Sequence, residues 1–282
     1  MGRRWEVRAA CRGRRSRRGN ANAPDGSARR WRAVVVLSFI FMGCQPRGVL
    51  VPEGDLLRDL YFRGSPAVST VALTFDDGPN GRCTEAVLDA LAALHAPATF
   101  FVLGKNVATA GNEGLLGRMV REGHVIGVHG YWHGVRRLFW QDVTEDDIRA
   151  AMREVGDALG RDGVVSAPRV RFFRPPFGFL LEQTAKAARR AGVHVVEWSV
   201  SVHDWRPELS GTDITKLVLE QARPGDVILL HDGDRTLQRS AERCVDRQPL
   251  IQALPMLVPA LRARGLEPVP LAQVLGLRAE VD

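Results

Sequence analysis

From about residue 66 to the end of the chain, apolar residues occur in two patterns: short continuous runs and helical spacing. Short apolar runs predict buried strands at residues 71–75, 98–102, 125–128, 170–173, 193–200, 227–230 and 268–270. Apolar residues at helical spacing predict helices between them, at residues 84–95, 144–159, 180–191, 213–222 and 251–264. Thr144 and Asp147 are spaced like a capping box, and Gly192, Gly225 and Gly265 mark helix ends.

This repeated succession of strand and helix predicts an α/β fold. Parallel strands need crossover connections, and helices of this length supply them. An α/β barrel and a doubly wound sheet both fit the pattern. No internal repeat and no linker rich in proline or serine divides the chain after residue 66, so we expect one domain there.

The positive charge of the chain is concentrated at its start. Residues 1–32 hold eleven arginines and two acidic residues, a local charge of +9 against +7 for all 282 residues, so the remainder is slightly acidic. We therefore expect residues 1–32 to be a basic, disordered tail. The folded part has no basic excess, and we do not expect nucleic acid as a partner.

A short apolar segment follows the tail at residues 33–44. It is too short for an ordinary membrane-spanning helix, but basic residues ahead of a short apolar run are typical of a signal peptide or a membrane anchor. We expect an extracytoplasmic protein, secreted or attached to the membrane through this segment. An early strand is the alternative.

Side chains that can do chemistry stand at the ends of five predicted strands. They are Asp76 and Asp77, His129 followed by His133, Arg174, Asp204 with Trp205, and His231. Each has an ordinary explanation alone, such as a turn or a satisfied histidine. The carboxyl ends of parallel strands share one face, however, where active sites form. Together they predict a functional site.

The residue types suggest a metal centre. One carboxylate and two imidazoles form a usual catalytic zinc set, and Asp77, His129 and His133 supply them. Asp76 is then free to act as a general base.

Two further residues complete the chemistry. Arg174 can balance the charge of the base, and His231 can act as a general acid. The chain shows neither a serine nucleophile elbow nor a phosphate-binding glycine loop. These residues suggest metal-assisted hydrolysis.

Five short sequences, in order, carry a family resemblance. TFDDGP (74–79), HGYWH (129–133), RPPFG (174–178), DW (204–205) and LLH (229–231) resemble the motifs of the polysaccharide deacetylases, the NodB-type carbohydrate esterases. The resemblance covers about residues 66–276, which we expect to form the catalytic domain. It implies a distorted (β/α) barrel of seven or eight parallel strands. It also implies a hydrolase that removes acetyl groups from N- or O-acetylated sugars with one divalent metal ion, usually zinc.

The resemblance also implies a role for each matching residue. The catalytic residues are Asp76 as base, Arg174 as its partner and His231 as acid, while Asp77, His129 and His133 bind the metal. The backbone N–H of Phe177 holds the oxyanion, and Trp205 and Leu229 form the wall of the pocket for the acetyl methyl group.

One position departs from the family pattern. Ser201 stands where the family usually has an aspartate, which we take to orient the acid histidine. Serine cannot stabilise an imidazolium by charge, so we expect a lower pKa for His231. Asp204 and Asp232 are the residues that could compensate.

Two cysteines follow the catalytic sequences. Cys83 comes after the first predicted strand and Cys244 after the sixth. If these loops meet across the barrel rim, an exported protein can join them by a disulfide. Two unrelated thiols are the alternative.

Other functions remain open on this scaffold. The first is an amidase that acts on small non-peptide C–N bonds, and the second is a metal- or glycan-binding pseudoenzyme. Aromatic residues on the expected top loops favour an acetylated glycan as the substrate: Tyr131, Trp132, Phe139, Trp140 and Phe179. The sequence makes no prediction of the oligomeric state.

Overall fold

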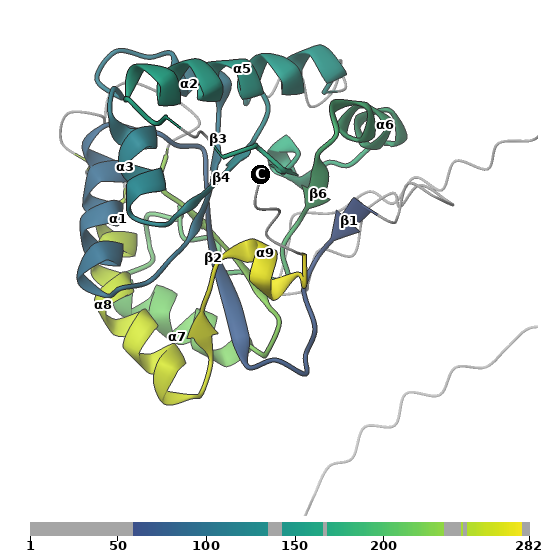
Figure 1. The fold of residues 1–282 in the computed structure, drawn as a ribbon. Coiled ribbons are helices and arrows are strands. Elements are labelled where there is room, and N and C mark those ends of the chain that lie inside the picture. The colour runs from purple at the N-terminus through teal and green to yellow at the C-terminus, as the bar shows by residue number, and fades with distance from the viewer. Residues whose placement is uncertain (1–58, 135–142, 166–167, 234–243, 245–246, 278–282) are drawn as a thin grey trace, which may run out of the picture. The chain divides into compact units, whose positions relative to one another are not determined.

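The computed structural model describes residues 59–134, 143–165, 168–233, 244 and 247–277 (Figure 1). The predicted tail at 1–32, the apolar segment at 33–44, and Phe139 and Trp140 lie outside these described residues. Among the helices that the structure describes, none is long and apolar enough to cross a membrane.

A parallel sheet forms the centre of the fold, as predicted. Its strands are β1 (Leu60–Tyr61), β2 (Thr70–Asp76), β3 (Thr99–Val102), β4 (Val125–Val128), β5 (Phe172–Phe173), β6 (His194–Val196), β7 (Val200–Ser201), β8 (Val227–His231) and β9 (Glu267–Pro268). They pair in the order β1-β6-β5-β4-β3-β2-β8-β7, and β9 pairs separately with β2. β1, which the sequence did not predict, joins this sheet ahead of residue 66.

The path of the chain between β6 and β7 shows that the sheet is curled. The run at 193–200, predicted as one strand, is two strands that lie near opposite ends of the strand order. The N–H of Glu197 donates to Tyr61 in β1 (2.8 Å), whereas the N–H of Ser199 donates to Val227 in β8 (3.0 Å). The four residue steps from Val196 to Val200 span at most roughly 14 Å. The two edges must therefore lie close together, and the sheet is a distorted barrel rather than a doubly wound sheet.

Helices connect the strands and cover the outer face of the barrel (Figure 1). Each of the five predicted helices is present. They are α1 (Arg82–Ala93), α5 (Glu145–Arg161), α6 (Glu182–Ala191), α7 (Gly211–Gln221) and α8 (Gln248–Ala263). The short helices α2 (Gly104–Val107), α3 (Leu115–Arg121) and α9 (Leu271–Val274) were not predicted, because they are too short to show a clear helical period. The capping box of Thr144 and Asp147 is confirmed.

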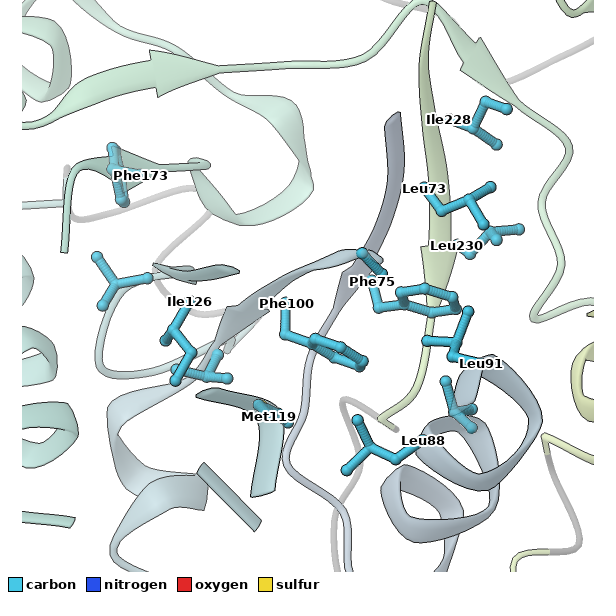
Figure 2. Close-up of a cluster of buried hydrophobic side chains, with 14 of the residues drawn as sticks. Leu73, Phe75, Leu88, Leu91, Phe100, Met119, Ile126, Phe173, Ile228 and Leu230 are labelled. Carbon is cyan, nitrogen blue, oxygen red and sulfur yellow. The ribbon is translucent and has the colours of Figure 1, made fainter. Parts of the chain in front are cut away.

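The outer face of the sheet holds the larger hydrophobic core (Figure 2). Side chains alternate along a strand, so Leu73 and Phe75 of β2 point outward and pack with Leu88 and Leu91 of α1. The ring of Phe75 stacks on that of Phe100 in β3, with 5.1 Å between the centroids. This alternation places Thr74 and Asp76 on the inner face.

The inner face changes from apolar to polar along the strands. A second cluster of buried apolar residues fills the interior near the start of β2 and β8: Ala72, Phe101, Phe172, Val196, Val227, Leu271 and Val274. Leu271 and Val274 belong to α9, which packs against β2. Two positions further along the chain, Ala72 is followed by Thr74 and Phe172 by Arg174, so the polar site lies directly above this apolar cluster.

A disulfide joins Cys83, in the first turn of α1, to Cys244 after β8. Their Cα atoms are 4.8 Å apart, and the residues are separated by 161 positions in the sequence. Of the two alternatives that the sequence left open, the structure has the disulfide, which ties the loop that follows β2 to the segment that follows β8.

We expect the double variant Cys83→Ala/Cys244→Ala to lose about 2–4 kcal/mol of unfolding free energy, because the bridge restricts a long loop of the unfolded chain. Urea denaturation under oxidising conditions measures the loss. The control is a reducing agent, which should destabilise the wild type and leave the variant unchanged. Equal stability of both proteins under oxidising conditions would contradict the prediction.

Candidate active site

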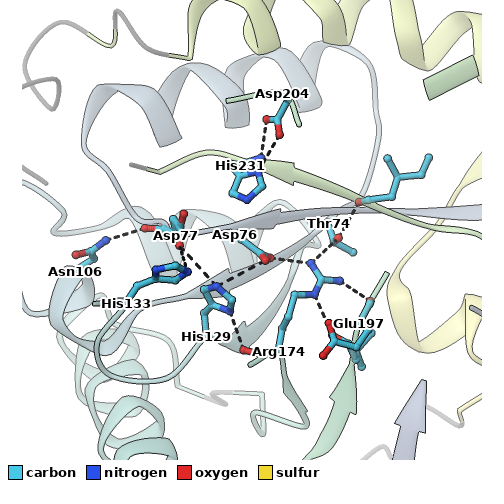
Figure 3. A network of polar contacts seen from close by, with 12 residues as sticks. Thr74, Asp76, Asp77, Asn106, His129, His133, Arg174, Glu197, Asp204 and His231 are labelled. Atoms are coloured by element: carbon cyan, nitrogen blue, oxygen red, sulfur yellow. Dashed lines mark hydrogen bonds and ion pairs between the residues drawn. The ribbon is translucent and has the colours of Figure 1, made fainter. Parts of the chain in front are cut away.

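Polar side chains at the carboxyl ends of four strands, β2, β4, β5 and β8, lie together at one end of the barrel interior (Figure 3). Asp76 ends β2 and lies beside His231, which ends β8, in the register of the sheet. The N–H of His129 donates to Val102 at the end of β3 (2.8 Å), and the N–H of Arg174 donates to Val128 at the end of β4 (3.0 Å). The parallel register therefore brings together residues that are far apart in the sequence.

The side chain of Arg174 is fully buried and holds three strands together. Its Nη1 donates to Asp76 Oδ1 (2.7 Å) and to Thr74 Oγ1 (2.9 Å), both in β2. Its Nε donates to the carbonyl of Val196 in β6 (2.9 Å), and its Nη2 to that of Glu197 (3.0 Å). A buried cation is tolerated only when its donors are satisfied in this way.

Asp76 is a buried carboxylate that forms an ion pair with Arg174. Burial raises the pKa of Asp76 above its usual value, and the attraction of Arg174 limits that rise. The other oxygen of Asp76, Oδ2, lies 3.8 Å from His129 Nε2. Arg174 is thus the partner of Asp76 that the sequence predicted, while burial keeps the carboxylate more basic than an ordinary aspartate.

Asp77, His129 and His133 form a compact buried cluster. His129 Nε2 lies 3.7 Å from Asp77 Oδ1, and His133 Nε2 lies 3.6 Å from the same oxygen. One ligand atom from each residue lies within 4.8 Å of the other two, as binding to a single ion requires.

The ring of His129 has the tautomer that a metal ligand requires. Its Nδ1 lies 2.7 Å from the carbonyl oxygen of Arg174, so Nδ1 carries the proton and the lone pair of Nε2 faces Asp77. Burial, aided by the charge of Arg174, lowers the pKa of His129 to about 3. The imidazole is neutral at physiological pH, the form in which it coordinates a cation.

The loop after β2 sends the two adjacent aspartates in different directions. Asp77 has a φ of 73°, in the left-handed region, which separates its side chain from that of Asp76. Asn106 Nδ2 donates to the carbonyl of Asp77 (2.7 Å), and Asn112 Nδ2 donates to that of Asn106 (2.7 Å). Neither asparagine was identified from the sequence, because nothing in the local pattern of residues 98–112 distinguishes a positioning amide from a loop residue.

Asp204, one of the two residues named as able to compensate for Ser201, is the partner of His231, so the lower pKa expected for His231 is wrong. Asp204 Oδ1 lies 2.8 Å from His231 Nδ1, and its Oδ2 accepts the backbone N–H of His231 (2.9 Å). Burial alone would lower the pKa of His231, but the nearby carboxylates, above all Asp204 and then Asp77 and Asp76, together raise it. Ser201 is instead the register neighbour of Leu229 in β8.

Asp232, the other residue named as able to compensate for Ser201, forms hydrogen bonds with the segment after β2. Its Oδ2 accepts the hydroxyl of Thr84 (2.6 Å), whose oxygen in turn accepts the N–H of Asn80 (2.8 Å). Burial raises the pKa of Asp232 to about 7. Its hydrogen bonds therefore support the loop that carries Asp77.

The three predicted substrate-binding residues lie around the site. The ring of Phe177 is 4.1 Å from that of His133, and Phe177 has a φ of 63° in the turn η2 (Pro176–Gly178). The partly exposed ring of Trp205 is 4.7 Å from that of His231. Leu229 is buried two residues before His231 and pairs in register with Thr74, so it lies on the same inner face.

Glu197 is a buried acid that the sequence did not reveal. Its side chain is almost fully buried, and Oε1 has no hydrogen-bond partner among the described residues. Burial raises the pKa of Glu197 to about 8, with Arg174 opposing the rise and Asp76 adding to it. It is therefore largely protonated at neutral pH. No sequence pattern separates it from a solvent-exposed glutamate at a strand end.

This site contains one carboxylate and two imidazoles that can hold a divalent ion, a second carboxylate beside an arginine, and a histidine paired with an acid. A curled α/β barrel with such a cluster at the carboxyl ends of its strands has the features of a metal-dependent hydrolase.

Comparison with known proteins agrees with this class. A family model for polysaccharide deacetylase matches residues 63–196. A chitooligosaccharide deacetylase of Bradyrhizobium sp. (strain ANU 289) is 38% identical over 208 residues, which cover 73% of this chain and 90% of that protein. A peptidoglycan-N-acetylglucosamine deacetylase of Bacillus cereus (strain ATCC 14579) is 36% identical over 225 residues, which cover 79% of this chain and 75% of that protein.

Solved structures include a relative with the same fold. The crystal structure of the Bc1960 peptidoglycan N-acetylglucosamine deacetylase superposes with a TM-score of 0.65 at 33% identity, covering 79% of this chain and 95% of that one. The chain therefore belongs to the polysaccharide deacetylase family.

We expect the stability of Glu197→Gln to exceed that of the wild type by an amount that grows as the pH rises from about 5 to 8. The folded pKa of Glu197 lies above its unfolded value, so the wild type loses stability across this window by up to about 1.4 kcal/mol per pH unit. Thermal unfolding at several pH values measures the difference. Glu208→Gln, at an exposed glutamate, is the control. A difference in stability between Glu197→Gln and the wild type that does not grow with pH would contradict a buried, protonated Glu197.

Proposed function

We propose that this protein is a metal-dependent deacetylase that hydrolyses the acetamide of an N-acetylated oligosaccharide or polysaccharide. The observation that carries the proposal is the division between two adjacent carboxylates: Asp77 faces two imidazoles, while Asp76 faces a guanidinium. The named activities of the relatives, on chitooligosaccharide and on peptidoglycan, support the same reaction.

The proposed metal ligands are Asp77, His129 and His133, and zinc is the ion that we propose for them. Two nitrogen donors and one carboxylate are a usual catalytic zinc set, and the tautomer of His129 fits it. A divalent ion held there supplies Lewis acidity, polarising the acetyl carbonyl and the attacking water.

In the proposed reaction, Asp76 takes a proton from the water that attacks the acetyl carbonyl carbon. The raised pKa of Asp76 favours this proton transfer, and Arg174 keeps the carboxylate in place. The backbone N–H of Phe177 is the proposed donor to the resulting oxyanion. His231 then gives a proton to the nitrogen as the C–N bond breaks, which releases acetate and a free amine.

The pocket for the acetyl methyl group is proposed to lie between Trp205 and Leu229. Leu229 is buried on the inner face, and Trp205 contacts the ring of His231. Apolar side chains beside the acid would favour the small acetyl group over water. All of these residues belong to the proposed catalytic domain at residues 66–276.

We infer an extracytoplasmic location. The disulfide between Cys83 and Cys244 supports it, because such bridges persist in oxidising compartments. Membrane attachment through residues 33–44, which lie outside the described residues, is part of this proposal.

Asp77→Asn and Asp76→Asn should fail in different ways. Asp77→Asn should lose bound metal, whereas Asp76→Asn should keep metal and lose at least about a hundredfold in kcat, since it removes the base. Elemental analysis measures the metal, and acetate release from chitooligosaccharides and peptidoglycan fragments measures turnover. No acetate release by the metal-loaded wild type would refute the proposed function, and identical behaviour of the variants would refute the division of roles.

Asp204→Asn should move the alkaline limit of kcat/KM to lower pH. The carboxylate raises the pKa of His231, and a general acid works only while protonated, so removing the charge makes activity decline at a lower pH. The pH–rate profile measures this limit, with Ser201→Ala as the control that leaves it unchanged. A larger shift for Ser201→Ala than for Asp204→Asn would overturn the assignment of Asp204.

A further inference from the structure

The proposed pocket for the acetyl group depends on one side chain that solvent can reach. Leu229 is buried in β8, but Trp205 lies on the loop after β7 and is 36% exposed. A large side chain on a loop has several staggered rotamers open to it, and contacts with its neighbours select one of them. The contacts that hold the Trp205 ring in place therefore set the size of the acyl group that the pocket admits.

Two imidazole rings contact the indole of Trp205. The centroid of the His231 ring is 4.7 Å from that of the indole, with 78° between the planes, and the centroid of the His203 ring is 4.9 Å from it, at 72°. Both are edge-to-face contacts, an arrangement that aromatic pairs prefer. His231 is fixed by Asp204 and by its place in β8 (Figure 3), so His203 is the contact that can be removed without disturbing the acid.

The backbone of the loop after β7 places His203 beside Trp205. Asp204 is buried and reaches His231, whereas His203 and Trp205 on either side of it are accessible to solvent. His203 has a φ of 55°, in the left-handed region, and its carbonyl accepts the N–H of Arg206 (3.0 Å). A positive φ is uncommon for a residue other than glycine. This turn sends the carboxylate inward and keeps the two rings together on the outside.

His203 acts through its ring rather than through a charge. Partial burial lowers the pKa of His203, and the charge of Arg206 lowers it further. Its imidazole is therefore neutral at physiological pH. The ring of His203 can thus support the indole without adding a second cation beside His231.

We propose that His203 is a positioning residue that holds the ring of Trp205 against His231 and so keeps the pocket narrow enough to select an acetyl group. This inference rests on the proposed function and specifies the acyl group accepted at the same site. Without the His203 ring, the indole gains rotamers that leave the wall open, and a longer acyl chain such as propionyl fits. With the ring in place, the additional methylene meets the indole, and a single methylene is enough for discrimination.

The test compares His203→Asn with the wild type, both metal-loaded, on tetra-N-acetylchitotetraose and its tetra-N-propionyl analogue. Asparagine lacks the ring but adopts the left-handed backbone readily, so the turn that carries Asp204 is retained. In the wild type, kcat/KM for the acetyl substrate should exceed that for the propionyl substrate about tenfold or more. In His203→Asn this ratio should fall about three- to fivefold, because one edge-to-face contact is lost and the propionyl substrate is turned over faster.

Two further variants separate the ring of His203 from its backbone. His95→Asn is the matched control, because His95 is also accessible to solvent and left-handed, with a φ of 47°, but lies between α1 and β3 at the amino end of the strands. It should leave the ratio unchanged. His203→Phe keeps an aromatic ring beside Trp205 and should retain the ratio of the wild type.

Three results would overturn the proposal. An equal loss of kcat/KM on both substrates in His203→Asn would mean that His203 maintains the turn rather than the pocket wall. An unchanged ratio in His203→Asn would also overturn it, as would a His203→Phe variant that behaves like His203→Asn. The alkaline limit of the pH–rate profile should stay in place in His203→Asn, because Asp204 still pairs with His231, and a shift of this limit would assign His203 to the acid instead.

Binding separates this proposal from the proposed function. Calorimetry in the Asp76→Asn background measures the affinity of the metal-loaded protein for both tetrasaccharides with and without His203→Asn, independently of turnover. A gain of affinity for the N-propionyl tetrasaccharide alone supports the role of His203 even if the wild type releases no acetate. Unchanged affinities refute this role even if deacetylation is observed.

Discussion

The buried guanidinium of Arg174 is the interaction on which the site depends. A cation inside an apolar barrel is costly unless each of its donors finds an acceptor. Here the acceptors come from Thr74 and Asp76 of β2 and from the carbonyls of Val196 and Glu197. These contacts tie distant strands to one another and place Asp76. The carbonyl of the same arginine sets the tautomer of a proposed metal ligand.

The two adjacent aspartates show how backbone geometry separates like charges. Side by side on a strand end, Asp76 and Asp77 would repel each other and resist burial. The left-handed backbone at Asp77 turns its carboxylate toward the histidines, while Asp76 stays on the inner face with Arg174. The amide of Asn106 holds the turn in this shape. Each carboxylate thus has separate partners.

The curl of the sheet matters as much as the residues at its strand ends. The path from β6 to β7 brings the two edges together, and the loop after β7 carries Asp204 to His231. The sequence named Asp204 only as one of two residues that could compensate for Ser201 beside His231. Ser201 and Asp204 are three residues apart. Which of them faces His231 depends on a turn that includes the left-handed backbone of His203.

The sequence by itself determined the alternation of strands and helices and the set of side chains at the strand ends, because periodicity and local residue order carry that information. It also identified both cysteines of the disulfide. Only the tertiary structure decided between a barrel and a doubly wound sheet, and assigned Asp204, Asn106 and Glu197 their surroundings. Burial, register and the distance between strands are set by long-range packing. A polar residue at a strand end looks the same in the sequence whether it faces solvent or a buried arginine.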